Sequence, residues 1–442
     1  MYFCHLKNLI KMINSETLQR LPLQEIQLLQ ETKMAETLAY AGTNSPYYRQ
    51  LFEQEKIDVA KIKTLEDLQQ IPVTTKQDLQ LRNMEFLCVQ PVQILDYVTT
   101  SGTLGEPVTF ALTQNDLNRL ALSECLSYAF CGCRTDDIIQ LMVTNDRAFM
   151  AGLACLLGSF KFGSGIIRVG NGIPELQWNT IKNIHTTVLN CVPSFILKLI
   201  EFADAQGINY RKSSIKKAIC VGEGLRNNDH TFNILGEKIH SLWPELSLYS
   251  NYASTEMQSS FNECEAQCGA HHKPDLTIVE FLDDDNRRVG EGEPGEITIT
   301  TLGVEGMPMI RFKTGDISVH FEEPCACGRH SIRLGPIIGR KGQMIKYKGT
   351  TLYPVALYDI LDNIPAITNY IVEVYTNTIG TDNICIRVGS LNNSELFVKQ
   401  IKDLFRSKVR VAPDVIFEPI ELIARKQMPP LSRKLVKFFD YR

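Results

Sequence analysis

The chain has 442 residues, of which 44% are hydrophobic and 22% are charged, and its formal net charge is −4. This length exceeds one ordinary hydrophobic core, so two domains are expected. The slightly acidic balance argues against a nucleic-acid-binding protein. The longest apolar run, residues 148–160, is too short to span a bilayer, so no membrane span is expected.

The N-terminal residues 1–12 contain His5, Lys7 and Lys11, and they lack a clean apolar core and a small-residue cleavage site. No signal peptide is therefore expected, and the protein is predicted to be cytoplasmic. The chain has 13 cysteines, which are then expected to be reduced thiols, some of them bound to metal.

The predicted elements begin with a polar, helical region over residues 15–90, in which Thr74 and Thr75 follow Pro72 as a helix start. From residue 92 to about 335, short apolar runs alternate with helical patterns, which predicts a largely parallel α/β sheet. Strands are predicted over 137–143, 186–192 and 216–222, and a buried helix is predicted over 148–160.

Two alternating runs flank a Gly/Pro/Asp turn in residues 280–302, which predicts an antiparallel hairpin. After residue 340 the pattern becomes that of a compact α+β unit. Its predicted strands and helices are 354–363 (helix), 367–376 and 383–389 (strands), and 394–408 (helix). The predicted fold class is therefore α/β, with a large N-terminal domain, residues 1–338, and a smaller C-terminal α+β domain, residues 339–442.

The stretch VTTSGTLGEPVTF, residues 98–110, places small hydroxyl residues and glycines between two strand-like runs. Gly102 and Gly105 permit backbone conformations that bring N–H groups close to an anion, and Ser101 and Thr103 add hydroxyl donors. A phosphate-binding loop and an ordinary polar hairpin turn are both compatible with this pattern.

Five motifs in order resemble those of the adenylate-forming superfamily. TTSGTLGEPV is similar to its phosphate loop, T-S-G-T-T-G-K-P. The others are GEG (222–224), similar to G-x-E-P; NYASTEM (251–257), similar to Y-G-x-T-E; RFKTGD (311–316), similar to Y-R-T-G-D; and GRKGQMIKYKG (339–349), similar to the interdomain hinge motif.

The resemblance implies a nucleotide site whose parts are carried over residue by residue. Thr255 would contact the α-phosphate, Glu256 would hold Mg²⁺, and Asp316 would bind the ribose hydroxyls. A carboxylate beside phosphates requires a cation between them, which supports Mg²⁺. The remaining nucleotide-binding residues would be Ser101, Gly102, Thr103 and Gly105 at the phosphates, Gly222, Glu223 and Gly224 at the adenine, and Tyr252, Ala253 and Arg340 in the later motifs.

Other stretches resemble the phenylacetate–CoA ligase branch of this superfamily. They are SPYY (45–48), IPVTTKQDL (71–79), MPMIRFKTGD (307–316), GTTLYP (349–354) and RKLVKFFD (433–440). In the last stretch, Lys434 matches the mobile catalytic lysine. The alternative is that Lys434 belongs to an ordinary solvated, charged tail.

A cysteine cluster is indicated by Cys264 and by the pair Cys325 and Cys327. Such spacing in an unexported protein favours metal over disulfides, and a Cys₃His set suits a closed, structural Zn²⁺ site. The resemblance to the phenylacetate–CoA ligase branch selects His271 as the fourth ligand. Cys268, His272 and His330 remain substitutes, and ordinary free thiols are the alternative to a metal site.

The chain departs from the superfamily pattern at three places. Glu106 occupies the usual lysine position of the phosphate loop, where a carboxylate weakens attraction for the triphosphate. Gly342 replaces the hinge aspartate. NDRAF (145–149) replaces a more aromatic, Gly-rich stretch, which puts phenylacetate itself in doubt. The apolar stretches 148–157 and 191–195 are expected to supply the acid pocket.

The resemblance implies an acid–thiol ligase (AMP-forming) that uses ATP to convert an aryl or other apolar carboxylic acid into an acyl-adenylate and then a coenzyme A thioester. One alternative transfers the acyl group to a carrier-protein thiol or an amine. Others are a catalytically weakened nucleotide-binding homologue and a Zn-dependent interaction module. No nucleic acid or membrane partner is expected, and a homodimer is left open.

Overall fold

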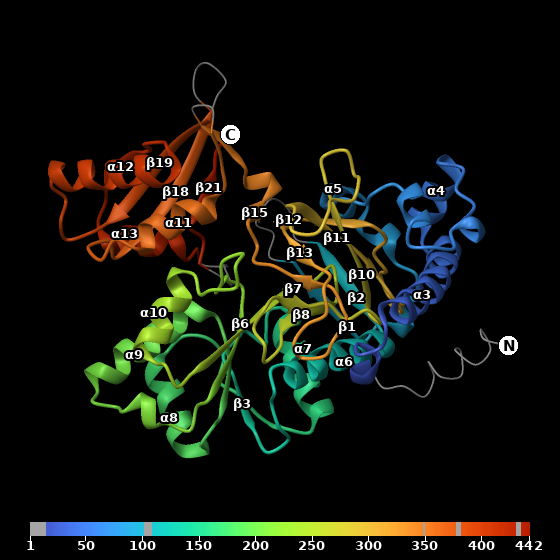
Figure 1. Ribbon diagram of the computed structural model, residues 1–442, viewed down its shortest axis with the longest axis horizontal. Coiled ribbons are helices and arrows are strands. Elements are labelled where there is room, and N and C mark those ends of the chain that lie inside the picture. Colours follow the sequence, from blue (N-terminus) through green and yellow to red (C-terminus); the bar gives the residue numbers. More distant parts are fainter. Residues whose placement is uncertain (1–14, 101–107, 348–349, 377–381, 430–434) are drawn as a thin grey trace. The chain divides into compact units, whose positions relative to one another are not determined.

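The computed structural model describes residues 15–100, 108–347, 350–376, 382–429 and 435–442. It divides into two compact units (Figure 1). Unit 1 comprises Met1–Thr314 and Ser318–Pro336, and unit 2 comprises Gly315–Ile317 and Ile337–Arg442. The predicted α/β class, with a large N-terminal and a smaller C-terminal domain, is confirmed, whereas the exact boundary between residues 338 and 339 stays a prediction.

The first part of unit 1 is helical, as predicted. Its helices are α2 (Ser15–Leu18), α3 (Leu23–Asn44), α4 (Pro46–Gln54) and α5 (Lys76–Arg82). Thr75 caps α5 by accepting from the Asp78 amide, while the Asp78 carboxylate accepts from the Thr75 amide. This capping box satisfies amides that have no partner within the helix, and it confirms the predicted helix start.

A large sheet forms the centre of unit 1. Among the described residues, its strand order is β13-β14-β9-β8-β7-β6-β5-β3-β4. The parallel strands are β3 (Ile138–Leu141), β4 (Gly165–Arg168), β5 (Val188–Cys191), β6 (Lys217–Val221) and β7 (Ser247–Ser254). The three strands predicted from residues 137–222 are β3, β5 and β6, and their parallel pairing is confirmed.

The other half of this sheet is antiparallel, which the sequence did not predict. Its strands are β8 (Ser259–Glu263), β9 (Ala270–His271), β13 (His320–Phe321) and β14 (Arg333–Leu334). The four residues between β7 and β8 are too few for a parallel crossover, so the chain reverses as a hairpin.

Helices cover both faces of the parallel strands. They are α6 (Gln114–Phe130), α7 (Met150–Phe162), α8 (Pro174–Ile184), α9 (Pro193–Ala205) and α10 (Ile234–Leu242). Side chains alternate between the two faces. Leu189 packs with Trp178 of α8 and Ile196 of α9, whereas the preceding Val188 packs with Tyr128 of α6. The helix predicted over 148–160 is confirmed as α7.

A second sheet has the strand order β10-β11-β12-β15, and one small hairpin stands apart. β10 (Thr277–Leu282) and β11 (Gly295–Thr301) pair antiparallel, which confirms the predicted hairpin, and β12 (Phe312–Ser318) follows β11 in strand order. β1 (Asp96–Thr99) and β2 (Thr109–Leu112) form the separate hairpin and flank residues 101–107, which lie outside the described residues.

Unit 2 contains the predicted α+β pattern. Its elements are β15 (Gly339–Arg340), β16 (Ile345–Tyr347), β17 (Thr350–Leu352), α11 (Pro354–Asp362), β18 (Asn369–Thr376), β19 (Asp382–Gly389), α12 (Glu395–Val409), β20 (Asp414–Phe417), α13 (Ile420–Gln427) and β21 (Phe438–Asp440). The sheet order is β20-β19-β18-β21. The sequence did not predict the elements after residue 409, of which β21 pairs parallel to β18 within the stretch 433–440.

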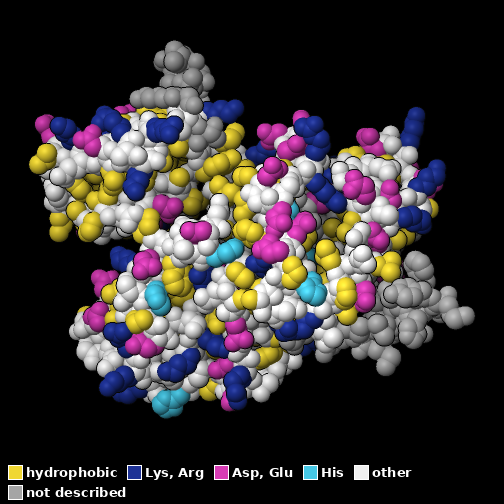
Figure 2. All heavy atoms as spheres, in the orientation of Figure 1, with side chains coloured by type: hydrophobic (Ala, Val, Ile, Leu, Met, Phe, Trp, Pro, Cys, Tyr) yellow, Lys and Arg dark blue, Asp and Glu magenta, His cyan; other side chains and the backbone are white. Residues whose placement is uncertain are grey.

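The described surface carries charges of both signs. On the face shown in Figure 2, the Lys and Arg side chains are interspersed with Asp and Glu on both units. None of the described helices is long and apolar enough to cross a membrane.

Two tryptophans allow the packing of unit 1 to be tested. Trp243 is fully buried and stacks on Trp178 with ring centroids 6.0 Å apart. The described residues offer the Trp243 indole N–H no acceptor, whereas Trp178 Nε1 donates to the Leu199 carbonyl at 2.9 Å.

Trp243→Ala should lower the free energy of unfolding by about 3–5 kcal/mol. Trp178→Phe should cost about 1 kcal/mol more than Trp243→Phe, because only the former loses a hydrogen bond. Urea unfolding measures both differences, and equal costs for the two Phe variants would contradict this account.

Candidate active site and metal centre

Two of the predicted nucleotide-binding segments leave neighbouring strands at the same edge of the sheet. The 222–224 segment follows β6, and the 251–257 motif includes the end of β7. The two strands are parallel, and Val221 lies opposite Asn251. Because the carboxyl ends of parallel strands meet at one edge, the structure brings Gly222, Glu223 and Gly224 to the edge that also carries the later motif.

The second motif forms the turn between β7 and β8, which we call the 255–258 turn. Thr255 and Glu256 are half-buried, and Met257 and Gln258 are fully buried. Tyr252 and Ala253 precede the turn on β7 and are half-buried and exposed, respectively. The turn therefore presents its hydroxyl and carboxylate while its second half is fixed in the core.

Glu223 has a partner that the motif did not indicate. Its carboxylate accepts hydrogen bonds from the Ser194 amide at 2.9 Å and from the Ser194 hydroxyl at 3.0 Å. Ser194 lies in the first turn of α9, where free amides and the helix dipole favour a carboxylate. The Glu223 side chain thus fixes the 222–224 segment against α9.

A buried ion pair follows this segment in the chain. Arg226 Nε donates to Glu263 at 2.6 Å, and the two side chains are 7% and 3% exposed. Glu263 also accepts from the Ser250 amide of β7 at 2.8 Å. Burial raises the pKa of Glu263, and the Arg226 guanidinium opposes that rise. Sequence reasoning missed this pair, for which the one signal was a glutamate beside Cys264.

The expected acid-pocket stretches also follow parallel strands. Residues 191–195 include the end of β5 and the start of α9, and residues 148–157 lead into α7 after β3. Arg147 and Ala148 have φ angles of 55° and 53°, a left-handed conformation that is unusual for residues with side chains. Both stretches therefore start at the sheet edge that carries the predicted nucleotide-binding segments.

Asp316 and Arg340, both in unit 2, are paired with each other. They are opposite residues of β12 and β15, and Arg340 Nε donates to Asp316 Oδ1 at 2.9 Å. Asp316 is 7% exposed. The pairing holds the Asp316 carboxylate in one orientation.

Two parts of the predicted site fall on residues that the structure does not describe. Ser101, Gly102, Thr103, Gly105 and Glu106 of the phosphate loop lie outside the described residues, and so does Lys434.

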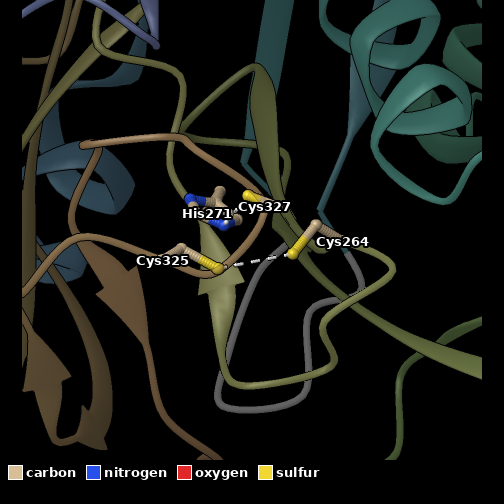
Figure 3. Close-up of side chains that lie close together, drawn as sticks. All are labelled: Cys264, His271, Cys325 and Cys327. Atoms are coloured by element: carbon tan, nitrogen blue, oxygen red, sulfur yellow. Dashed lines mark hydrogen bonds between the residues drawn. The ribbon is translucent and has the colours of Figure 1, made fainter.

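The predicted cysteine cluster is assembled by the fold. Figure 3 shows Cys264, His271, Cys325 and Cys327 pointing toward one another, and their ligand atoms all lie within 4.8 Å of one another. The Cys264 and Cys325 sulfurs are 3.7 Å apart, and Cys327 Sγ lies 3.4 Å from His271 Nε2. Hydrogen bonds from Cys264 and His271 lower the pKa of the Cys327 thiol, which favours the thiolate at this one position. The pKa of Cys264 is raised by its hydrogen bond to Cys327, and that of Cys325 is raised by burial, so without a metal the proton stays on those two sulfurs.

The contacts of His272, His330 and Cys268, the other possible ligands, differ from those of the four cluster residues. His271 Nδ1 lies 2.9 Å from Ser331 Oγ, and this contact directs Nε2 to the cysteines, as an outer hydrogen-bond partner does for a ligating histidine. His272 Nδ1 donates a hydrogen bond to the Ile332 carbonyl, and His330 Nδ1 donates one to the Leu21 carbonyl. Cys268 Sγ lies 3.5 Å from Cys325 Sγ, but Cys268 does not belong to the group whose ligand atoms all lie within 4.8 Å of one another.

Comparison with known proteins identifies the family. The model of the AMP-binding enzyme family matches residues 18–306. A phenylacetate–coenzyme A ligase of Thermus thermophilus is 29% identical over 400 residues, which cover 89% of this chain and 86% of the relative. One from Escherichia coli is 25% identical over 437 residues, 95% of each chain.

A solved structure of 2-hydroxyisobutyryl-CoA ligase, in complex with 2-HIB-AMP in the postadenylation state, superposes with a TM-score of 0.82. It is 21% identical, and the match covers 96% of this chain and 91% of the other. The fold and the predicted resemblance to phenylacetate–CoA ligases are therefore confirmed. The family model spans more than half of the sequence, so this chain belongs to the AMP-binding enzyme family.

Proposed function

We propose that the chain is an AMP-forming acid–coenzyme A ligase that activates a carboxylic acid with ATP and then forms a thioester. The observation that carries the proposal is family membership, joined to the meeting of two nucleotide motifs at one sheet edge. The relatives are named as phenylacetate–coenzyme A ligases, and the predicted enzyme class is confirmed.

In the first half-reaction, a carboxylate oxygen of the acid attacks the α-phosphorus of ATP, and pyrophosphate leaves. Catalysis of such a transfer depends on positioning and on donors at the phosphate oxygens. We assign the hydrogen-bond donors to the hydroxyls of Thr255, Ser101 and Thr103 and to the amides of Gly102 and Gly105. Lys434 would supply a positive charge at the reacting phosphate. Mg²⁺ held by Glu256 would neutralise phosphate charge.

The base and ribose contacts are assigned to two further groups. The main chain of the 222–224 segment would lie against the adenine, because the Glu223 side chain is engaged by Ser194. Tyr252 and Ala253 are assigned to the same nucleotide site, at the sheet edge that carries the 222–224 segment. Asp316 would accept from the ribose hydroxyls with its orientation fixed by Arg340.

In the second half-reaction, the coenzyme A thiolate attacks the acyl carbonyl and AMP leaves. Forming the adenylate first converts a poor leaving group into a good one. A rotation of the smaller domain about residues 340–342 would withdraw Lys434 and admit the thiol. Gly342 lies in the short helix Lys341–Gln343, and a glycine absorbs such backbone rotation easily. The acid is proposed to be aryl or otherwise apolar.

A structural Zn²⁺ ion is proposed for the cysteine cluster, with Cys264, His271, Cys325 and Cys327 as ligands. Three thiolates and one imidazole match its preferred tetrahedral donor set, and four protein ligands leave no open position for chemistry. Its contribution would be stability, because it connects the end of β8 to residues 325–327.

The proposed function is tested by acid-dependent ATP–pyrophosphate exchange with aryl, hydroxyaryl, short-chain and long-chain acids, without coenzyme A. Exchange is expected with an apolar class, and added coenzyme A should then yield its thioester. If ATP binds but no acid supports exchange, the double variant Glu106→Lys with Gly342→Asp decides the cause. Restored exchange would identify a weakened enzyme, whereas a continued lack of exchange would mean that the panel lacks the substrate and would contradict the proposed aryl or apolar acid.

The 255–258 turn gives a second prediction. Thr255→Val removes the donor to the α-phosphate, and Glu256→Gln removes the magnesium ligand. Each should lower the exchange rate about 100-fold, the usual scale for losing one transition-state contact. Glu201→Gln, an exposed glutamate of α9, is the control and should leave the rate unchanged. Full activity of both turn variants would remove them from the site.

Metal analysis tests the cluster. The purified protein should contain about one zinc per chain. Cys325→Ser should abolish zinc binding and lower the thermal unfolding midpoint, because binding energy of a structural metal is folding energy. Cys268→Ser is the matched control, since its sulfur lies beside Cys325 but outside the proposed ligand set. Loss of zinc from the Cys268 variant, or its retention in the Cys325 variant, would show the assignment to be wrong.

A further inference from the structure

A buried cation, the Arg119 side chain, contacts the main chain of the 255–258 turn. Arg119 belongs to α6, which packs against β8 (Figure 1), and it is 6% exposed. Its guanidinium donates to three main-chain carbonyls: Nη1 to Gln258, Nε to Leu302 and Nη2 to Leu276. Burial lowers the pKa of Arg119 to about 10, so the side chain stays protonated at neutral pH. One planar guanidinium thus fixes three chain segments that are distant in sequence.

The carbonyl that Arg119 holds belongs to a residue in an unfavourable conformation. Gln258 closes the turn with a φ of 48°, in the left-handed region that residues with side chains avoid. Its amide lies 3.3 Å from the Thr255 carbonyl, so its conformation sets the path of the turn. Such a conformation persists only where surrounding contacts impose it.

We infer that Arg119 is a positioning residue for the first half-reaction. Its bond to the Gln258 carbonyl holds the turn in the conformation that presents the Thr255 hydroxyl and the Glu256 carboxylate together. Without that bond Gln258 relaxes toward a negative φ, the peptide groups of the turn rotate, and the two side chains diverge. This inference rests on the proposed function of the turn. Sequence patterns gave no sign of it, because Arg119 and Gln258 are 139 residues apart.

The first test is Arg119→Lys, which keeps the positive charge but cannot donate to three carbonyls in a fixed fork. Calorimetry on the full chain measures the dissociation constant of Mg-ATP, and this measurement needs no acid substrate. The dissociation constant should rise about tenfold, equivalent to about 1.4 kcal/mol. The half-saturating Mg²⁺ concentration for exchange should rise with it. If the variant binds Mg-ATP with wild-type affinity, this inference is overturned and the proposed function is not. Absence of Mg-ATP binding by the wild type would overturn the proposed function and this inference with it.

A second test separates positioning from general stability. Glycine accepts a positive φ without strain, whereas alanine does not. The double variant Arg119→Lys with Gln258→Gly should therefore recover most of the lost Mg-ATP affinity. Arg119→Lys with Gln258→Ala removes the same amide side chain and should not recover it. Equal affinities in the two double variants would overturn the inference.

Arg333→Lys is the matched control for loss of a buried arginine. Arg333 is 2% exposed, and it donates to the Cys268 and Glu323 carbonyls and to the Glu323 carboxylate, none of which belongs to the turn or to a nucleotide motif. It should lower the thermal unfolding midpoint by an amount comparable to Arg119→Lys and leave Mg-ATP affinity unchanged. The same loss of affinity in both variants would show that the Arg119 effect is general destabilisation.

Discussion

The parallel pairing of β6 with β7 is the constraint on which the candidate site depends. It places Val221 opposite Asn251, so the segments that follow the two strands reach the same sheet edge. Helices on both faces bury these strands, which leaves their carboxyl ends as the place where polar residues meet a ligand. The 222–224 segment and the 255–258 turn occupy that edge, and a change in strand order would separate them.

Charged side chains hold this edge in place. The half-buried Glu223 is hydrogen-bonded to the start of α9, the buried Arg226 pairs with Glu263, and the buried Arg119 holds the Gln258 carbonyl. Burying a charge is costly unless its hydrogen bonds are satisfied, and Arg119 and Arg226 each find partners on two or more segments. Their value is geometric, because a fixed polar network admits one arrangement of the loops it connects.

The β7–β8 hairpin links the candidate active site to the cysteine cluster. The 255–258 turn precedes β8, and Cys264 follows the last residue of that strand. Glu263, at the same end, is paired with Arg226 beside the 222–224 segment. A metal bound by Cys264 would therefore limit the movement of a strand whose other end carries the predicted nucleotide-binding residues.

The sequence by itself determined the elements and motifs that depend on near neighbours. The Thr75 cap, the strands around residues 138–221 and the identity of the nucleotide motifs follow from patterns a few residues long. Only the tertiary structure decided the antiparallel half of the large sheet, the engagement of Glu223 by Ser194, and the partners of Arg119 and Arg226. The contacts of Glu223 with Ser194, of Arg226 with Glu263 and of Arg119 with its three carbonyls join residues 29 to 183 positions apart, and sheet order and helix packing bring them together. No local period encodes such a pairing, because its energy comes from burial that exists only once the whole unit has folded.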